Sequence, residues 1–127
     1  MGIFGELLGN ASKVDIEKVK QEYAKILAAG EHIDKAYRVI RDLLIFTDKR
    51  LILINVQGIT GKKVEYHSIP YRSIRQFVVA STGHFELEAE LKIYVADMGT
   101  KPLALTFGKD DDVYEVQSML ADYISRA

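Results

Sequence analysis

The sequence contains no cysteine, and this absence removes two classes of small protein from consideration. Without thiols the chain has no disulfide framework and no thiolate zinc site. Long apolar runs are missing as well. The runs at residues 43–46 and 51–54 are far shorter than the roughly 20 residues that a helix needs to cross a bilayer. The sequence therefore predicts a protein that does not span a membrane.

A phosphate-binding loop is also lacking, although the stretch QGITGKKVEY, which begins at Gln57, resembles one at first sight. The G-x-x-x-x-G-K-[ST] pattern requires a glycine five residues before Gly61, where this chain has Val56, and a Ser or Thr at Lys63. The residues that follow are typical of a strand, so no helix N-terminus is available to attract an anion. This stretch predicts a turn between two strands.

What the chain does contain is enough for one globular domain, with 127 residues, 48% hydrophobic and 28% charged. The first residues lack the basic leader and long apolar stretch of an export signal. Glu6 stands where an N-myristoylation motif has Ser or Thr. We therefore expect a cytoplasmic protein.

The net charge of −1 conceals an uneven distribution along the chain. Residues 35–75 contain nine Lys and Arg against three Asp and Glu, whereas residues 76–127 contain four against nine. If the basic and acidic segments lie at opposite ends of the folded chain, the molecule has a charge dipole. The basic end could then bind an anionic partner, or copies of the chain could dock with opposite ends together. Basic and aromatic residues alternate between Tyr66 and Phe77, but the pI of about 6.3 argues against nucleic acid as the partner.

The periodicity of apolar residues predicts helix, then strands, then helix. Helical spacing runs from Asp15 to Leu27, with Ser12 or Asp15 as the N-cap and Gly30 at the end. From Glu31 to about Gly108 the period falls to two, and the turn residues divide this part into about seven strands. After the acidic residues 110–112, which suit a helix N-terminus, an apolar stripe predicts a last helix: Val113, Val116, Leu120 and Ile124.

Three motifs carry a resemblance to a known family: RDLLIFTDKRLILI, QGITGKKVEYHSIPYRSI and GHFELEAELKIY. Together they resemble the bacterial pleckstrin-homology-like domains over essentially the whole chain. The resemblance implies a mainly β (α+β) pleckstrin-homology (PH) barrel, in which two packed sheets of about seven antiparallel strands are closed at one end by the C-terminal helix. It also implies homo-oligomeric rings and no enzymatic activity. We expect an N-terminal helical extension over residues 1–29 and the barrel with its C-terminal helix over residues 30–127, as one globular unit.

Specific phosphoinositide binding is not expected. Eukaryotic PH domains recognise these lipids through basic residues around the first hairpin, where this chain reads YRVIRDLLIF. Arg38 and Arg41 are present, but Asp42 lies at the turn and the second strand opens with two leucines. The chain also lacks the tryptophan of the last helix. Non-specific attraction to anionic surfaces stays open.

No residue pattern points to catalysis, a cofactor or a metal. His32, His67 and His84 form no metal-ligand spacing, and Ser68, Ser73 and Ser81 have no evident general base. Glu86, Glu88 and Glu90 share one strand face about 7 Å apart, but this face is the polar one, where carboxyl pKa values are not raised by burial. We expect a solvated or intersubunit face.

Two basic pairs, Lys49–Arg50 and Lys62–Lys63, lie at opposite ends of the third strand and are too far apart for one phosphate clamp. They are either solvated hairpin tips or contacts between subunits. A closed ring of identical subunits requires a heterologous contact. Our hypothesis is that Lys62 and Lys63, with Lys49 and Arg50 as alternates, face the row of Glu86, Glu88 and Glu90 of a neighbouring copy.

The sequence thus predicts a non-enzymatic binding or scaffold module that forms a ring and presents a composite surface to a partner, such as another protein. The alternative is a peripheral membrane adaptor. It would use the basic hairpins and an N-terminal apolar cluster on one side of a short helix, namely Ile3, Phe4, Leu7 and Leu8. Few lysines flank this cluster, which favours docking on the barrel or on a neighbour.

Overall fold

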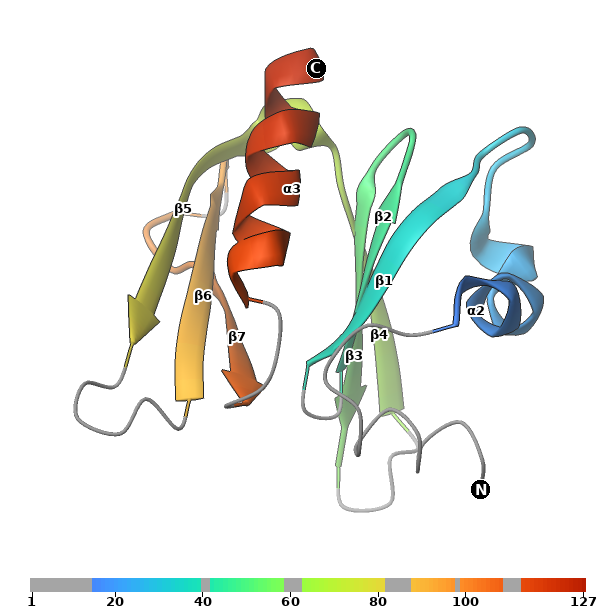
Figure 1. Cartoon of the computed structure of the whole chain (residues 1–127), viewed down its shortest axis with the longest axis horizontal. Helices are drawn as coiled ribbons and strands as arrows, with labels where there is room; N and C mark the ends of the chain where they lie inside the picture. Colours follow the sequence, from blue (N-terminus) through green and yellow to red (C-terminus); the bar gives the residue numbers. More distant parts are fainter. Residues whose placement is uncertain (1–14, 40–41, 59–62, 82–87, 98, 109–112) are drawn as a thin grey trace.

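The computed structural model describes residues 15–39, 42–58, 63–81, 88–97, 99–108 and 113–127 (Figure 1). Helix α2 (Ile16–Glu22) and the 3₁₀ turn η1 (Ala24–Ile26) precede seven strands, and α3 (Val113–Arg126) follows them. The strands are β1 (Ile33–Val39), β2 (Asp42–Thr47), β3 (Leu51–Gln57), β4 (Lys63–Ile69), β5 (Ile74–Ser81), β6 (Glu88–Val95) and β7 (Leu103–Gly108), with the 3₁₀ turn η2 (Tyr71–Ser73) between β4 and β5.

The strands form two antiparallel sheets, ordered β1-β2-β3-β4 and β5-β6-β7. Within each sheet, every strand pairs with its neighbours in sequence, whereas β4 and β5 are consecutive but belong to different sheets. The turn predicted between Gly58 and Gly61 falls between β3 and β4, where Gln57 pairs with Lys63 and Gly58 has a φ of +81°, which favours glycine; residues 59–62 lie outside the described residues. The predicted number of strands is confirmed.

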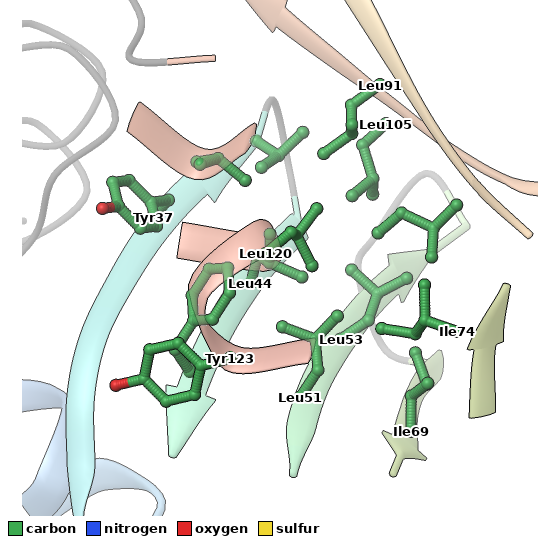
Figure 2. Close-up of a cluster of buried hydrophobic side chains, with 14 of the residues drawn as sticks. Tyr37, Leu44, Leu51, Leu53, Ile69, Ile74, Leu91, Leu105, Leu120 and Tyr123 are labelled. Atoms are coloured by element: carbon green, nitrogen blue, oxygen red, sulfur yellow. The ribbon is translucent and has the colours of Figure 1, made fainter. Parts of the chain in front are cut away.

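The main core lies between the two sheets and under α3 (Figures 1 and 2). The four-stranded sheet contributes residues such as Leu44 and Leu53, and the three-stranded sheet contributes Leu91 and Leu105. Helix α3 adds its predicted stripe, of which Val113, Val116 and Leu120 are buried. Tyr123 is also buried, whereas Ile124 is only partly buried. The predicted closure of the barrel by the C-terminal helix is confirmed.

A second apolar cluster covers the other face of the four-stranded sheet. Helix α2 lies against this outer face (Figure 1), where Val19 is buried among strand residues that include Ile45 and Ile52. Burial on both faces explains why the runs at residues 43–46 and 51–54 do not alternate with polar residues. The four-stranded sheet is thus the middle layer between α2 and the main core.

The first helix is shorter than the Asp15–Leu27 segment that the periodicity predicted. It ends at Glu22 and continues through Tyr23 into η1, although its apolar residues still face the sheet. Of the two predicted N-cap candidates, Asp15 is the N-cap, because its side chain accepts a hydrogen bond from the Glu17 amide at 2.9 Å. Gly30 has a φ of +76°, which allows the chain to turn towards β1.

Candidate functional site

The two residues of the first basic pair have different environments. Arg50 is turned into the protein and forms a bidentate ion pair with Glu31, from Nε to Oε2 and from Nη2 to Oε1, each at 2.9 Å. Its Nη2 also donates to the Ile26 carbonyl at 2.6 Å, and its Nη1 donates to Ser68 Oγ at 2.7 Å. The guanidinium is therefore occupied by intramolecular partners, which leaves Lys49 as the exposed cation of this turn.

The buried partner of this ion pair, Glu31, is fully hydrogen-bonded. It accepts from Thr47 Oγ1 at 2.6 Å and from the Ala28 amide at 2.8 Å, in addition to Arg50. Burial alone would raise the pKa of Glu31, but the hydrogen bonds from Arg50, Thr47 and Ala28 outweigh it and lower the pKa to about 2. The carboxylate thus stays ionised and joins the segment after η1 to the β2–β3 turn.

The second basic pair lies where β4 begins. Lys63 is the first residue of β4 and is exposed, whereas Lys62 lies outside the described residues. Val64 and Tyr66, which follow Lys63 in β4, lie on the outer face of the sheet. Val64 pairs with Val56, and Tyr66 pairs with the outward-facing Ile54. Val64 is 36% exposed and Tyr66 is 48% exposed. Val64 and Tyr66 thus form an exposed apolar patch, the β4 patch, and Lys63 precedes it on the strand, with its side chain on the opposite face.

Of the predicted glutamate row, Glu90 is the member whose side chain the structure describes, and it lies on the three-stranded sheet. Leu91 and Ile93 of β6 point into the core, so Glu90 occupies the outer face of this sheet, as the alternation predicted. Glu90 lies 3.7 Å from Lys92 on the same strand, and this ion pair offsets part of its charge. Glu88 opens β6, and Glu86 lies outside the described residues. The contact of this row with Lys62 and Lys63 of another copy stays a prediction.

The hairpin that carries the lipid-binding residues of eukaryotic PH domains is β1–β2. Here Arg38 is buried on the outer face of the sheet, and its Nη1 lies 3.4 Å from the Asp42 carbonyl oxygen. Burial lowers the pKa of Arg38, partly offset by Tyr23, Glu22 and Asp42. The side chain of Asp42 accepts from the Val56 amide and the Asn55 side chain. Arg38 is thus part of the packed fold rather than an exposed cation of the hairpin.

Other predicted features have these positions. The N-terminal cluster of Ile3, Phe4, Leu7 and Leu8 lies outside the described residues. Across the described ranges, no helix has the length and apolar character needed to cross a membrane. In the same part of the chain, no three His, Asp or Glu side chains gather in a way that could hold a metal ion.

Sequence reasoning missed the Glu31–Arg50–Thr47 network and the role of Tyr71. Tyr71 is buried and donates a hydrogen bond to the Thr47 carbonyl at 2.6 Å, so it links η2 to the end of β2. No spacing rule joins these residues, because they come from separate turns. The non-alternating runs of β2 and β3 were the one available signal for the layer formed by α2.

Comparison with known proteins agrees with this architecture. The bacterial PH domain family matches residues 2–124. The uncharacterized protein YjqA of Bacillus subtilis (strain 168) is 47% identical over 121 residues, which cover 95% of this chain and 97% of YjqA.

Two crystal structures are also similar. One is a pleckstrin homology domain from Shewanella amazonensis SB2B, with 45% identity, a TM-score of 0.79 and coverage of 97% of this chain and 98% of that chain. The other is a DUF1696 family protein with a pleckstrin-homology domain from Shewanella loihica PV-4, with 43% identity, a TM-score of 0.77 and coverage of 91% and 97%. This chain therefore belongs to the bacterial PH domain family, as its sequence, its sheet order and its closing helix all indicate.

Proposed function

We propose that the chain is a non-enzymatic binding module that assembles with copies of itself into a ring and presents a composite surface to a protein partner. The observation that carries this proposal is the exposed edge of the four-stranded sheet. Within the described residues, β4 pairs with β3 alone, so its other edge is open. An open edge offers unpaired backbone N–H and C=O groups to another chain.

The β4 patch adds apolar surface to this open edge. Val64 and Tyr66 continue the outer apolar cluster beyond the part of the sheet that α2 covers, since they pair with Val56 and Ile54 of β3. Exposed apolar surface beside an open edge is a feature that monomeric proteins usually avoid. Its presence supports an interface, in which Tyr66 supplies the amphipathic contact that aromatic residues commonly make.

A ring requires that the β4 patch meets a different surface on the next copy. The outer face of the three-stranded sheet, which carries Glu90, is the surface that the charges favour. Lys63 opens the strand that carries the patch on one copy, and Glu90 lies on the outer face of the three-stranded sheet on the other. Exposed ion pairs contribute only about 0–1 kcal/mol each, so the apolar patch supplies most of the affinity and the charges supply orientation.

Light scattering coupled to size-exclusion chromatography tests this proposal. The wild type is expected to be a stable oligomer at micromolar concentration, and Tyr66→Lys is expected to reduce its mass because the substitution places a charge in the apolar contact. Tyr114→Lys is the matched control, because Tyr114 is 69% exposed on α3, away from β4. A monomeric wild type, or a Tyr66→Lys variant with the wild-type mass, would contradict the proposal.

A further inference from the structure

The apolar outer face of the four-stranded sheet continues past the part that α2 covers. Helix α2 packs over β1, whereas the β4 patch lies on the strand at the other edge of this sheet. In the row between them, Ile54 of β3 is 1% exposed, but its partner Tyr66 on β4 is 48% exposed. The neighbouring pair is Val56, which is half-buried, and Val64, which is 36% exposed. The β4 patch is thus an uncovered extension of a face that is otherwise packed.

The chain itself supplies an apolar segment for this patch. Residues 1–14 precede the described part of the chain, which begins at Asp15, the N-cap of α2. Residues 1–12 contain one charged side chain, Glu6, together with the N-terminal apolar cluster of Ile3, Phe4, Leu7 and Leu8. We propose that this cluster docks on the β4 patch of its own chain and competes there with the next copy. The docking is independent of the ring, whereas the competition rests on the proposed ring contact.

The segment between the cluster and α2 is long enough for this docking. The β4 patch lies three strand spacings from β1, which corresponds to about 14 Å. Residues 9–14 can span up to about 20 Å when extended. The patch also adjoins the end of α2. Burial is the main reason that the pKa of Tyr23, the C-cap of α2, rises to about 12, and the charge of ionised Tyr66 adds to this rise.

The small size of the patch favours a tethered occupant. Val64 and Tyr66 offer too little surface to offset the entropy that a separate molecule loses on association. A short flexible tether raises the effective concentration of the cluster to the millimolar range, so a weak contact is sufficient. Residues 1–12 contain no Lys or Arg, and the cluster therefore lacks the cations that draw an apolar helix to anionic lipid.

The docked segment would control self-assembly, because the ring contact requires the same patch. The apparent affinity between copies scales with the fraction of chains in which the patch is free. If the segment is docked in about 90% of separate chains, removing the docking should strengthen assembly about tenfold. The ring contact would then form only when a neighbouring copy displaces the segment.

Disulfide formation tests the docking, because the chain has no cysteine of its own. Ile3→Cys or Leu7→Cys is combined with Val64→Cys in the full chain, and the intrachain disulfide is quantified by mass in a glutathione redox buffer. Its effective concentration should exceed by about tenfold or more that measured when Tyr114→Cys, at an exposed position on α3, replaces Val64→Cys. Adding Phe4→Ser should remove most of this excess, which separates docking from the tether alone.

Three results would overturn the docking. An interchain disulfide in place of the intrachain one would put the cluster on a neighbouring copy. Equal effective concentrations for Val64→Cys and Tyr114→Cys would show that the cluster does not select the β4 patch. An excess that persists with Phe4→Ser would show that the tether alone brings the two thiols together.

Light scattering over a dilution series tests the competition. Full-length Phe4→Ser/Leu7→Ser should assemble at a lower concentration than the wild type, and Ala11→Ser, which leaves the cluster intact, is the matched control and should not. Unchanged or weaker assembly of the double variant would contradict the competition. If the wild type and the double variant are both monomeric, the ring contact and the competition are both wrong, whereas the disulfide result still decides the docking.

Discussion

Arg50 and Glu31 form a bidentate ion pair in which both nitrogen–oxygen distances are 2.9 Å and the carboxylate is fully buried. Removing one partner of such a pair destabilises the protein, because the other charge is left buried without compensation. The pair joins three parts of the chain, since Arg50 also donates to the Ile26 carbonyl and to Ser68 of β4. A basic residue that the sequence offered as a candidate for intersubunit contacts thus stabilises the fold.

Acid should therefore destabilise the protein through Glu31. Its pKa is about 2 in the folded protein and 4.5 ordinarily, so its contribution is fully present above about pH 4.5 and is lost as the pH falls towards 2. The difference corresponds to roughly 3 kcal/mol of unfolding free energy. Urea unfolding at pH 7 and pH 3 measures it. Glu31→Gln should lower stability at pH 7 and reduce the loss between the two pH values.

The control for this measurement is Glu17→Gln, because Glu17 is exposed and its contact with Lys20 is a weak surface ion pair at 3.5 Å. This variant should change the unfolding free energy by less than about 1 kcal/mol. A Glu31→Gln protein with the same acid sensitivity as the wild type would show that other carboxylates cause the loss.

The outer face of the four-stranded sheet should be as sensitive to truncation as a core. Ile45 is buried against α2, on the opposite face of β2 from Leu44. Ile45→Ala is expected to cost about 2–5 kcal/mol, similar to Leu44→Ala, since both leave a cavity. Val64→Ala on the exposed part of the same face should cost less than about 0.5 kcal/mol. Chemical denaturation of the three variants measures these values, and a small effect of Ile45→Ala would mean that α2 does not cover this face in solution.

Alkaline pH should weaken the fold through Tyr123. Burial and its hydrogen bond to Asp34 raise the pKa of Tyr123 to about 12, from an ordinary value of 10.0. The unfolded chain releases this proton first, so stability is lost as the pH rises from 10 towards 12. Tyr123→Phe should reduce this alkaline loss while it lowers stability at pH 7 by about 1 kcal/mol through the missing hydrogen bond. Thermal unfolding at pH 8 and pH 10.5 checks this result.

Tyr114→Phe serves as the comparison, because Tyr114 is 69% exposed on the same helix. It should leave both the stability at pH 7 and the alkaline loss unchanged. Equal behaviour of the two variants would indicate that Tyr123 does not keep its proton in the folded protein.

Charge reversal tests the orientation proposed for the ring contact. Lys62→Glu/Lys63→Glu should weaken assembly by up to about fivefold per lost ion pair, and a further reversal of Glu86 and Glu88 to Lys should restore part of it. The expected effect is larger at low salt because exposed charges are screened. Analytical ultracentrifugation at two salt concentrations measures the change. If the lysine reversal leaves the oligomer intact at both concentrations, these lysines form only a solvated hairpin tip.

The sequence by itself determined the order of elements and the family. Period-two alternation located β6, turn residues separated the hairpins, and an apolar stripe marked α3, because these signals depend on neighbours within a few residues along the chain. Three motifs were sufficient for the bacterial PH resemblance, which the family match over residues 2–124 confirms. The Asp15 cap was predictable for the same local reason.

Only the tertiary structure decided which charges are available to a partner. Lys49 and Arg50 are adjacent in sequence, yet one is exposed and the other is paired with Glu31, 19 positions away. The convergence of Lys49, Arg72 and Arg126 on one cleft likewise depends on how two sheets and a helix pack. The physical reason is that ion pairing and burial depend on distances between segments remote in sequence, and hydrophobic periodicity specifies the face of each segment but not its neighbour across the core.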